Sequence, residues 1–172
     1  MKSWHLISML AAVLLLAGCG VLSRTPEEKA AEEARTMQLV RQRLAARKYR
    51  VDIGFMKPLR GGMQSVTSPY SLTVNGSHLI SYLPYIGVAY NLPYGGGKGL
   101  NFESEISEYT ERWLGDRHII VFVTKNDEDV LVYHLEVFDN GSADLNVRSR
   151  NRESIDFRGE LNPDFDPDAP EE

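Results

Sequence analysis

The sequence predicts a mainly β domain, α+β by element count, in which one N-terminal amphipathic helix precedes an antiparallel meander of about eight strands. Apolar residues recur at helical spacing up to residue 47 and then alternate strictly with polar residues from Tyr49 onward. Turn residues such as Asn75-Gly76 and Asp139-Asn140-Gly141 separate the alternating segments. Short neighbouring strands joined in this way fold into a β-sandwich or a partial barrel.

The N-terminal helix is expected over residues 26–47. Thr25 can cap it, Pro26 suits the first helical position, and Glu28 completes a capping box. We expect the first half of the helix to be a spacer and the second half to dock on the β domain. A coiled-coil partner helix is the alternative. The apolar positions form one narrow stripe: Ala30, Ala34, Met37, Val40 and Leu44.

The β domain is expected over residues 48–160. If Lys125 lies opposite Val130 in one hairpin, both of its faces are apolar, so we expect a second sheet and the helix to cover it. The same register places His118 and His134 on opposite faces, where they cannot share a metal ion. The predicted strands are residues 49–55, 70–74, 78–83, 100–113, 118–125, 130–138, 143–149 and 153–159.

The N-terminus carries the parts of a secretory signal: cationic Lys2, an apolar run over residues 6–17, and small residues before Cys19. The apolar run is too short to span a bilayer. The sequence Leu16-Ala17-Gly18-Cys19 resembles the lipobox of bacterial lipoproteins. The resemblance implies that residues 1–18 are a signal peptide and that Cys19 carries palmitate-type lipid, with residues 19–25 as a tether. An ordinary signal peptide with a chance cysteine is the alternative.

This interpretation predicts a lipid-anchored protein of the cell envelope, which we expect at the outer membrane, facing either the periplasm or the surface. Removal of Lys2 with the signal peptide changes the formal net charge from −5 to −6. An acidic domain has no general attraction for nucleic acid or anionic headgroups, so we expect the lipid on Cys19 to be its membrane contact. Because Cys19 is the only cysteine, no intramolecular disulfide can form.

The segment over residues 81–102 departs most from this regularity, because it is rich in tyrosine and glycine. Tyrosine suits stacking on a sugar or peptide, and glycine permits close backbone approach. We therefore take five residues as candidates for binding a glycan, lipid or peptide: Tyr82, Tyr85, Tyr90, Tyr94 and Lys98. The alternative is that these rings close an end of the sheet, and we expect at least two of the four tyrosines to be buried.

The sequence contains no complete motif for binding a nucleotide or a metal ion, or for catalysis. The run over residues 95–99 is not a phosphate-binding loop, because Leu92 and Gly99 stand where glycine and serine or threonine are required. No nucleotide, metal or other cofactor is predicted, and no catalytic residue is assigned. The acidic residues Glu103 and Glu105 leave a hydrolase open, although carboxylates along a strand are usually solvated. An acidic, proline-rich tail over residues 161–172 is expected to be disordered.

Several segments carry a resemblance to a known family. The specific ones are Leu83-Pro84-Tyr85 and Tyr94-Gly95-Gly96-Gly97, supported by Ser68-Pro69-Tyr70 and Leu145-Asn146-Val147. From the helix through Glu160, the chain resembles an uncharacterised family of Bacteroidetes lipoproteins, domain of unknown function 4251. The resemblance implies a lipid-anchored envelope protein with one compact domain. We expect a non-enzymatic binding or scaffold module; an envelope assembly protein that uses its helix is the alternative, and a hydrolase a further one.

Overall fold

The computed structural model describes residues 25–91 and 99–166. Residues 34–172 form one compact unit, and residues 25–33 contribute the start of the helix. Cys19, the predicted signal peptide, Tyr94, Lys98 and the end of the predicted tail lie outside the described residues. The described elements are α2 (Pro26–Ala45), β1 (Lys48–Pro58), β2 (Gln64–Ser65), β3 (Ser71–Asn75), β4 (His78–Leu83), β5 (Leu100–Leu114), β6 (Arg117–Lys125), β7 (Val130–Phe138), β8 (Ser142–Ser149) and β9 (Ile155–Leu161).

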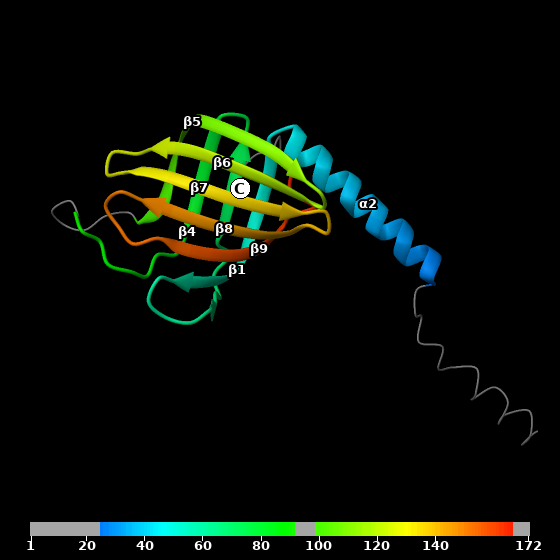
Figure 1. Cartoon of the computed structure of the whole chain (residues 1–172), viewed down its shortest axis with the longest axis horizontal. Coiled ribbons are helices and arrows are strands. Elements are labelled where there is room, and N and C mark those ends of the chain that lie inside the picture. The colour runs from blue at the N-terminus through cyan, green and yellow to red at the C-terminus, as the bar shows by residue number, and fades with distance from the viewer. Residues whose placement is uncertain (1–24, 92–98, 167–172) are drawn as a thin grey trace, which may run out of the picture. The chain divides into compact units, whose positions relative to one another are not determined.

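The described strands form one antiparallel sheet in the order β2-β1-β3-β4-β5-β6-β7-β8-β9, and β1 pairs with β9 as well. Eight strands therefore close into a barrel, and β2 is attached to β1 outside the ring (Figure 1). The predicted mainly β meander is confirmed. Of the two architectures that the sequence left open, the structure has the barrel rather than the sandwich.

Side chains fill the barrel. Along β7, buried and half-buried residues alternate, so that every second side chain points inward. The rings of Phe122 and Tyr133 stack at 4.8 Å, and the hydroxyls of Tyr49 and Tyr109 lie 3.4 Å apart. Phe122, Tyr133 and Tyr49 are fully buried, so the interior is a packed core.

The hairpin of β6 and β7 has the predicted register, with Lys125 opposite Val130. Its inner face is buried in the core, as Ile120 and Leu135 show. The expectation that a second sheet and the helix cover both faces is wrong, because one sheet closes on itself and leaves the other face outside. Val121 and Val132 on that outer face are half-buried.

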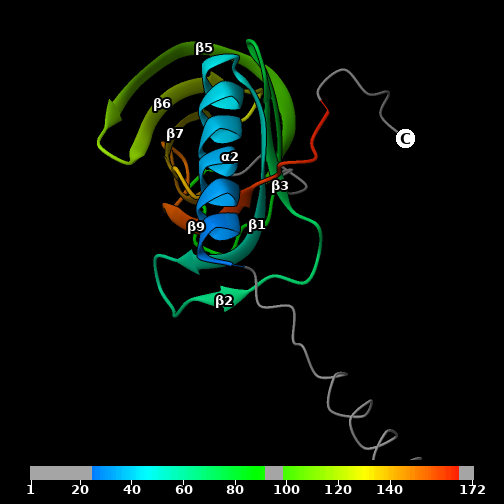
Figure 2. The ribbon, with the colours of Figure 1, turned by 90° about the vertical axis from the view of Figure 1, so that its right-hand side faces the viewer.

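The second half of α2 lies across one end of the barrel (Figure 2). Val40 and Leu44 are buried there, and Arg41 donates two hydrogen bonds, of 2.9 and 2.8 Å, to the carboxylate of Asp139 in the turn between β7 and β8. Docking of this half is therefore confirmed. The helix ends at Ala45, before the predicted residue 47, because Arg47 adopts a left-handed conformation with φ of 52°.

The capping box is confirmed as well. The Thr25 amide donates to the Glu28 carboxylate at 2.8 Å, and the Glu28 amide donates to the Thr25 hydroxyl at 3.2 Å. At the other end of the chain, β9 begins at Ile155 rather than at residue 153 and runs to Leu161, which the sequence had assigned to the tail.

The pairing of β1 with β9, here called the seam, closes the barrel. At Gly159 the two strands approach each other so closely that a side chain has no space. A Cβ atom added to Gly159 would collide with the carbonyl oxygen of Asp52. The register of the two strands shifts between Ile53 and Phe55, next to this contact. The seam therefore requires glycine at this position.

We expect Gly159→Ala to lower the free energy of unfolding by about 1–3 kcal/mol, because the new methyl group must push β9 away from β1. Gly54→Ala is the matched control, since no atom lies within 4 Å of its added Cβ. Urea denaturation followed by circular dichroism measures both variants. Equal stability of the two would contradict the steric account.

Candidate functional site

The three described tyrosines among the candidates, Tyr82, Tyr85 and Tyr90, differ in their exposure and in their contacts. Tyr82 lies on the outside of β4, is 43% exposed and packs against Tyr70, with 5.1 Å between the ring centroids. Tyr90 is 67% exposed, and its amide bonds to the carbonyl of Asn151. The expected burial of at least two tyrosines is not seen in the described residues, because Tyr85 is only half-buried and the other two are exposed.

Tyr85 has a packing role. Its hydroxyl lies 3.1 Å from the carbonyl oxygens of both Val88 and Glu153, to which it can donate. A Cβ atom on Gly87 would lie 2.7 Å from that hydroxyl oxygen, so glycine is needed for the loop to fold over the ring. Burial raises the pKa of Tyr85. The ring holds the loop against the start of β9.

Buried charges close the same end of the barrel. The Arg152 side chain is 4% exposed and pairs with Glu128 at 3.1 Å and Asp129 at 3.6 Å. Asp129 also accepts a hydrogen bond from the Ser149 hydroxyl. Glu153 pairs with Arg60 at 3.0 Å. Because each charge has an opposite partner, the network is structural, and it was not predicted from the sequence.

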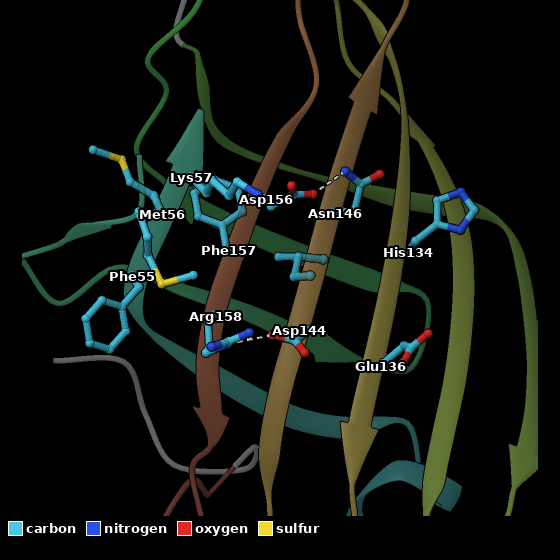
Figure 3. Close-up of a pocket in the computed structure, with 12 residues that line it drawn as sticks. Phe55, Met56, Lys57, His134, Glu136, Asp144, Asn146, Asp156, Phe157 and Arg158 are labelled. Carbon is cyan, nitrogen blue, oxygen red and sulfur yellow. Dashed lines mark hydrogen bonds and ion pairs between the residues drawn. The ribbon is translucent and has the colours of Figure 1, made fainter. Parts of the chain in front are cut away.

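A groove of about 290 Å³ lies on the outer wall, across β1, β9, β8 and β7 (Figure 3). Its apolar side is formed by Phe55, which is 44% exposed, and by Met63 in the connection between β1 and β2, which is 51% exposed. Polar side chains on the other three strands form the rest of the lining. The groove therefore has one apolar and one polar side.

The polar side is an ordered ladder of side chains. The Asn146 amide donates to Asp156 at 2.6 Å, and the Arg158 guanidinium donates to Asp144 at 2.9 Å, as the dashed lines in Figure 3 show. These pairs connect β8 with β9 at register positions two residues apart, on the same face of the sheet. His134 stands beyond them on β7 (Figure 3). Burial lowers its pKa, which favours the neutral ring at neutral pH.

The charges of the groove balance. Its lining contains the cations Lys57 and Arg158 and the anions Glu136, Asp144 and Asp156. Arg117 compensates the third anion, because its guanidinium lies 3.0 Å from Glu136. A charge-balanced surface that offers both donors and acceptors suits an uncharged polar ligand. The sequence showed these residues as the polar positions of separate strands and could not bring them together.

A second opening, of about 720 Å³, is lined by β4, by the first part of β5 and by the turn between β6 and β7. Tyr82 and the two acidic candidates, Glu103 and Glu105, are among its lining residues. The Ser77 hydroxyl donates to Glu105 at 2.6 Å and lowers the pKa of that carboxyl, and His78 lowers it further. A general acid for glycoside cleavage needs a raised pKa. Glu105 is therefore shifted in the wrong direction for that role.

Two further findings concern the described residues alone. No helix among them is long and apolar enough to cross a membrane. No group of three or more histidine, aspartate or glutamate side chains among them is arranged to hold a metal ion.

The fold and the groove define a closed antiparallel barrel with a helix across one end and a mixed polar and apolar surface site. The chain belongs to the family described as domain of unknown function (DUF4251), which matches residues 27–161. The family resemblance drawn from the sequence is thereby confirmed.

A solved relative shares this fold. The chain is similar to the crystal structure of a DUF4251 family protein from Bacteroides eggerthii DSM 20697, with 17% sequence identity and a TM-score of 0.59. The match covers 77% of this chain and 91% of that chain. At this identity the likeness shows the fold alone. No curated protein matches the chain.

His118 and His134 lie on opposite faces of the sheet, as the hairpin register predicts. His118 is 1% exposed and points into the barrel, whereas His134 lines the outer groove, so their placement on opposite faces is confirmed. The His118 ring stacks on Trp113 at 4.0 Å, and its Nε2 lies 3.2 Å from a Glu111 carboxylate oxygen, which in turn faces Arg47 at 3.7 Å. Burial lowers the pKa of His118 although Glu111 raises it, and the net shift is downward.

We expect acid to quench the fluorescence of Trp113 with a midpoint below 6.5, because a protonated imidazole stacked on indole is a quencher. Residues 20–172 suit this test, since they contain Trp113 and lack the other tryptophan, Trp4. The unfolded chain binds the His118 proton first, so the free energy of unfolding should fall as pH drops below about 6.5. His118→Phe should abolish the acid quenching, and a midpoint at or above 6.5 would contradict the assignment.

Proposed function

We propose that this protein is a lipid-anchored, non-enzymatic binding module of the bacterial cell envelope, with the groove of Figure 3 as its ligand site. The anchor would be Cys19, on the strength of the Leu16-Ala17-Gly18-Cys19 sequence. The groove carries the binding part of the proposal, because it joins an exposed apolar wall to a charge-balanced polar ladder. The packed core supports an exterior site, since aromatic side chains occupy the interior.

The ligand would be a small, uncharged, polar molecule with one apolar face, and a sugar has this chemistry. One face of a sugar ring can stack on Phe55, while its hydroxyls donate to Asp144 or Asp156 and accept from Asn146 or Arg158. A groove of about 290 Å³ accommodates one or two sugar units and lies at the lower limit for small-molecule sites.

The alternatives have less support. In an assembly protein that recruits a partner through the helix, Val40 and Leu44 would be unavailable, because both are already buried against the barrel. The general acid of a glycoside hydrolase would need a raised pKa, and the pKa of Glu105 is lowered. Neither alternative uses the polar ladder of β8 and β9.

Lipidation has a direct test. Mass spectrometry of the protein from membranes of a diderm bacterial host should find an N-terminal cysteine that carries diacylglycerol and a further acyl chain. Cys19→Ala should leave the protein without lipid and move it out of the membrane fraction, because no other residue would hold the chains. An unmodified Cys19 with residues 1–18 still attached would reject the anchor.

Binding is tested with residues 20–172 against an array of neutral oligosaccharides. Phe55→Ala should weaken binding by about tenfold, through lost stacking on an exposed ring. Asp156→Asn should weaken it too, since the amide exchanges an acceptor for a donor. Tyr90→Ala is the matched control, because it removes an exposed ring outside the groove and should change nothing. Binding that responds to Tyr90→Ala and not to the groove variants would reject this site.

A further inference from the structure

The groove of Figure 3 adjoins another opening on the outer wall of the barrel. This opening, here called the β5–β7 opening, has a volume of about 500 Å³ and is lined by residues of β5, β6 and β7. Its two residues on β7, His134 and Glu136, line the groove as well. The groove and the β5–β7 opening therefore meet along β7. Together they cross β1, β9, β8, β7, β6 and β5, which follow one another in the sheet.

Strand register places the outward side chains of this surface in two rows. Each member of a row lies opposite the next one on the adjacent strand. The first row is Lys57, Asp156, Asn146, His134, Val121 and Thr110. The second row is Phe55, Arg158, Asp144, Glu136, Ile119 and Arg112. Because the rows are two residues apart along each strand, they share one face of the sheet, and Figure 3 shows both of them from β1 to β7.

The charges of the two rows balance. Their cations are Lys57, Arg112 and Arg158, and their anions are Glu136, Asp144 and Asp156. Arg158 and Asp144 also bond to each other between β9 and β8. A surface with equal numbers of both charges has no general attraction for a polyanion or a polycation. It offers hydrogen-bond donors and acceptors to uncharged groups such as hydroxyls.

The surface is elongated and has apolar side chains toward both ends. Phe55 on β1 is 44% exposed, and Ile119 and Val121 on β6 are half-buried in the β5–β7 opening. The polar side chains of β7, β8 and β9 lie between them. Successive strands are about 4.8 Å apart, so the path from β1 across to β5 is about 24 Å long. A ligand that fills this path must be longer than the one or two sugar units that the groove accommodates.

We propose that the groove and the β5–β7 opening form one continuous site for a linear, neutral polysaccharide that lies across the strands. The inference rests on the proposed function and names its ligand class. A polysaccharide repeats hydroxyl groups and apolar ring faces, which match a polar ladder between two apolar regions. An extended peptide suits this surface less, because it binds by adding a strand to a free sheet edge, and these strands already pair with one another.

The length of the sugar chain provides the test. Residues 20–172, which contain every described residue, are titrated calorimetrically with disaccharides and hexasaccharides of neutral glucan, mannan and xylan. In a series that binds, we expect the hexasaccharide to bind at least about tenfold more tightly than the disaccharide, because its further units reach the β5–β7 opening. A smaller gain would overturn this inference and leave the groove as a site for a short sugar. Absence of binding in these series and in the oligosaccharide array would reject the inference together with the proposed function.

Variants locate the further sugar units. Arg112→Ala should weaken hexasaccharide binding about fivefold and leave disaccharide binding unchanged, because Arg112 lines the β5–β7 opening and not the groove. Phe55→Ala should weaken both, because its ring lies in the groove. Arg150→Ala is the matched control, which removes an exposed arginine outside both openings and should bind as the parent does. Circular dichroism checks the fold of each variant. Parent-like hexasaccharide binding by Arg112→Ala, or an equal loss for both lengths, would overturn the extended site.

Discussion

Closure of β1 on β9 is the constraint on which the rest of the structure depends. These strands pair although about 100 residues separate them in the chain, and the carbonyl of Asp52 occupies the space where a Gly159 side chain would lie. A closed sheet has no long free edge to pair with another chain. It also turns one face of every strand inward, which is how Tyr49, Phe122 and Tyr133 come to fill a common core. What the molecule offers to a ligand is therefore the outer wall and the two ends.

The two ends of the barrel are closed by different kinds of interaction. At one end, Val40 and Leu44 of the helix bury apolar surface, and the paired charges of Arg41 and Asp139 fix its orientation. At the other end, a short loop is held by Tyr85 and by the buried Arg152 network. Removing one member of such a network would leave its partners charged and buried, so its members depend on one another. The tyrosine and glycine composition of this loop partly reflects that packing.

Much of the fold could be predicted from local patterns in the sequence. The capping box of Thr25 and Glu28, the bounds of β4 and β7, and the hairpin register at Lys125 all follow from neighbouring residues. Closure could not be predicted, because it depends on a contact between the two ends of the sheet. The groove was missed for the same reason: Phe55 and Asp156 become neighbours only once β1 meets β9. Apolar residues on both faces of β6 suggested two covers, but the outer ones are half-buried on the exterior wall.

Net charge is a poor guide to what such a barrel can contact, because its charges are segregated along the chain. The first turns of α2 carry Glu27 and Glu28, as expected at a helix N-terminus, and the docked half carries only cations. Docking then places one of those cations, Arg41, 5.1 Å from the centroid of the Trp113 ring, while the carboxylates Glu103 and Glu105 line the second opening. A charged surface interacts over about a Debye length, roughly 8 Å at physiological salt, so it responds to this local arrangement rather than to the sum.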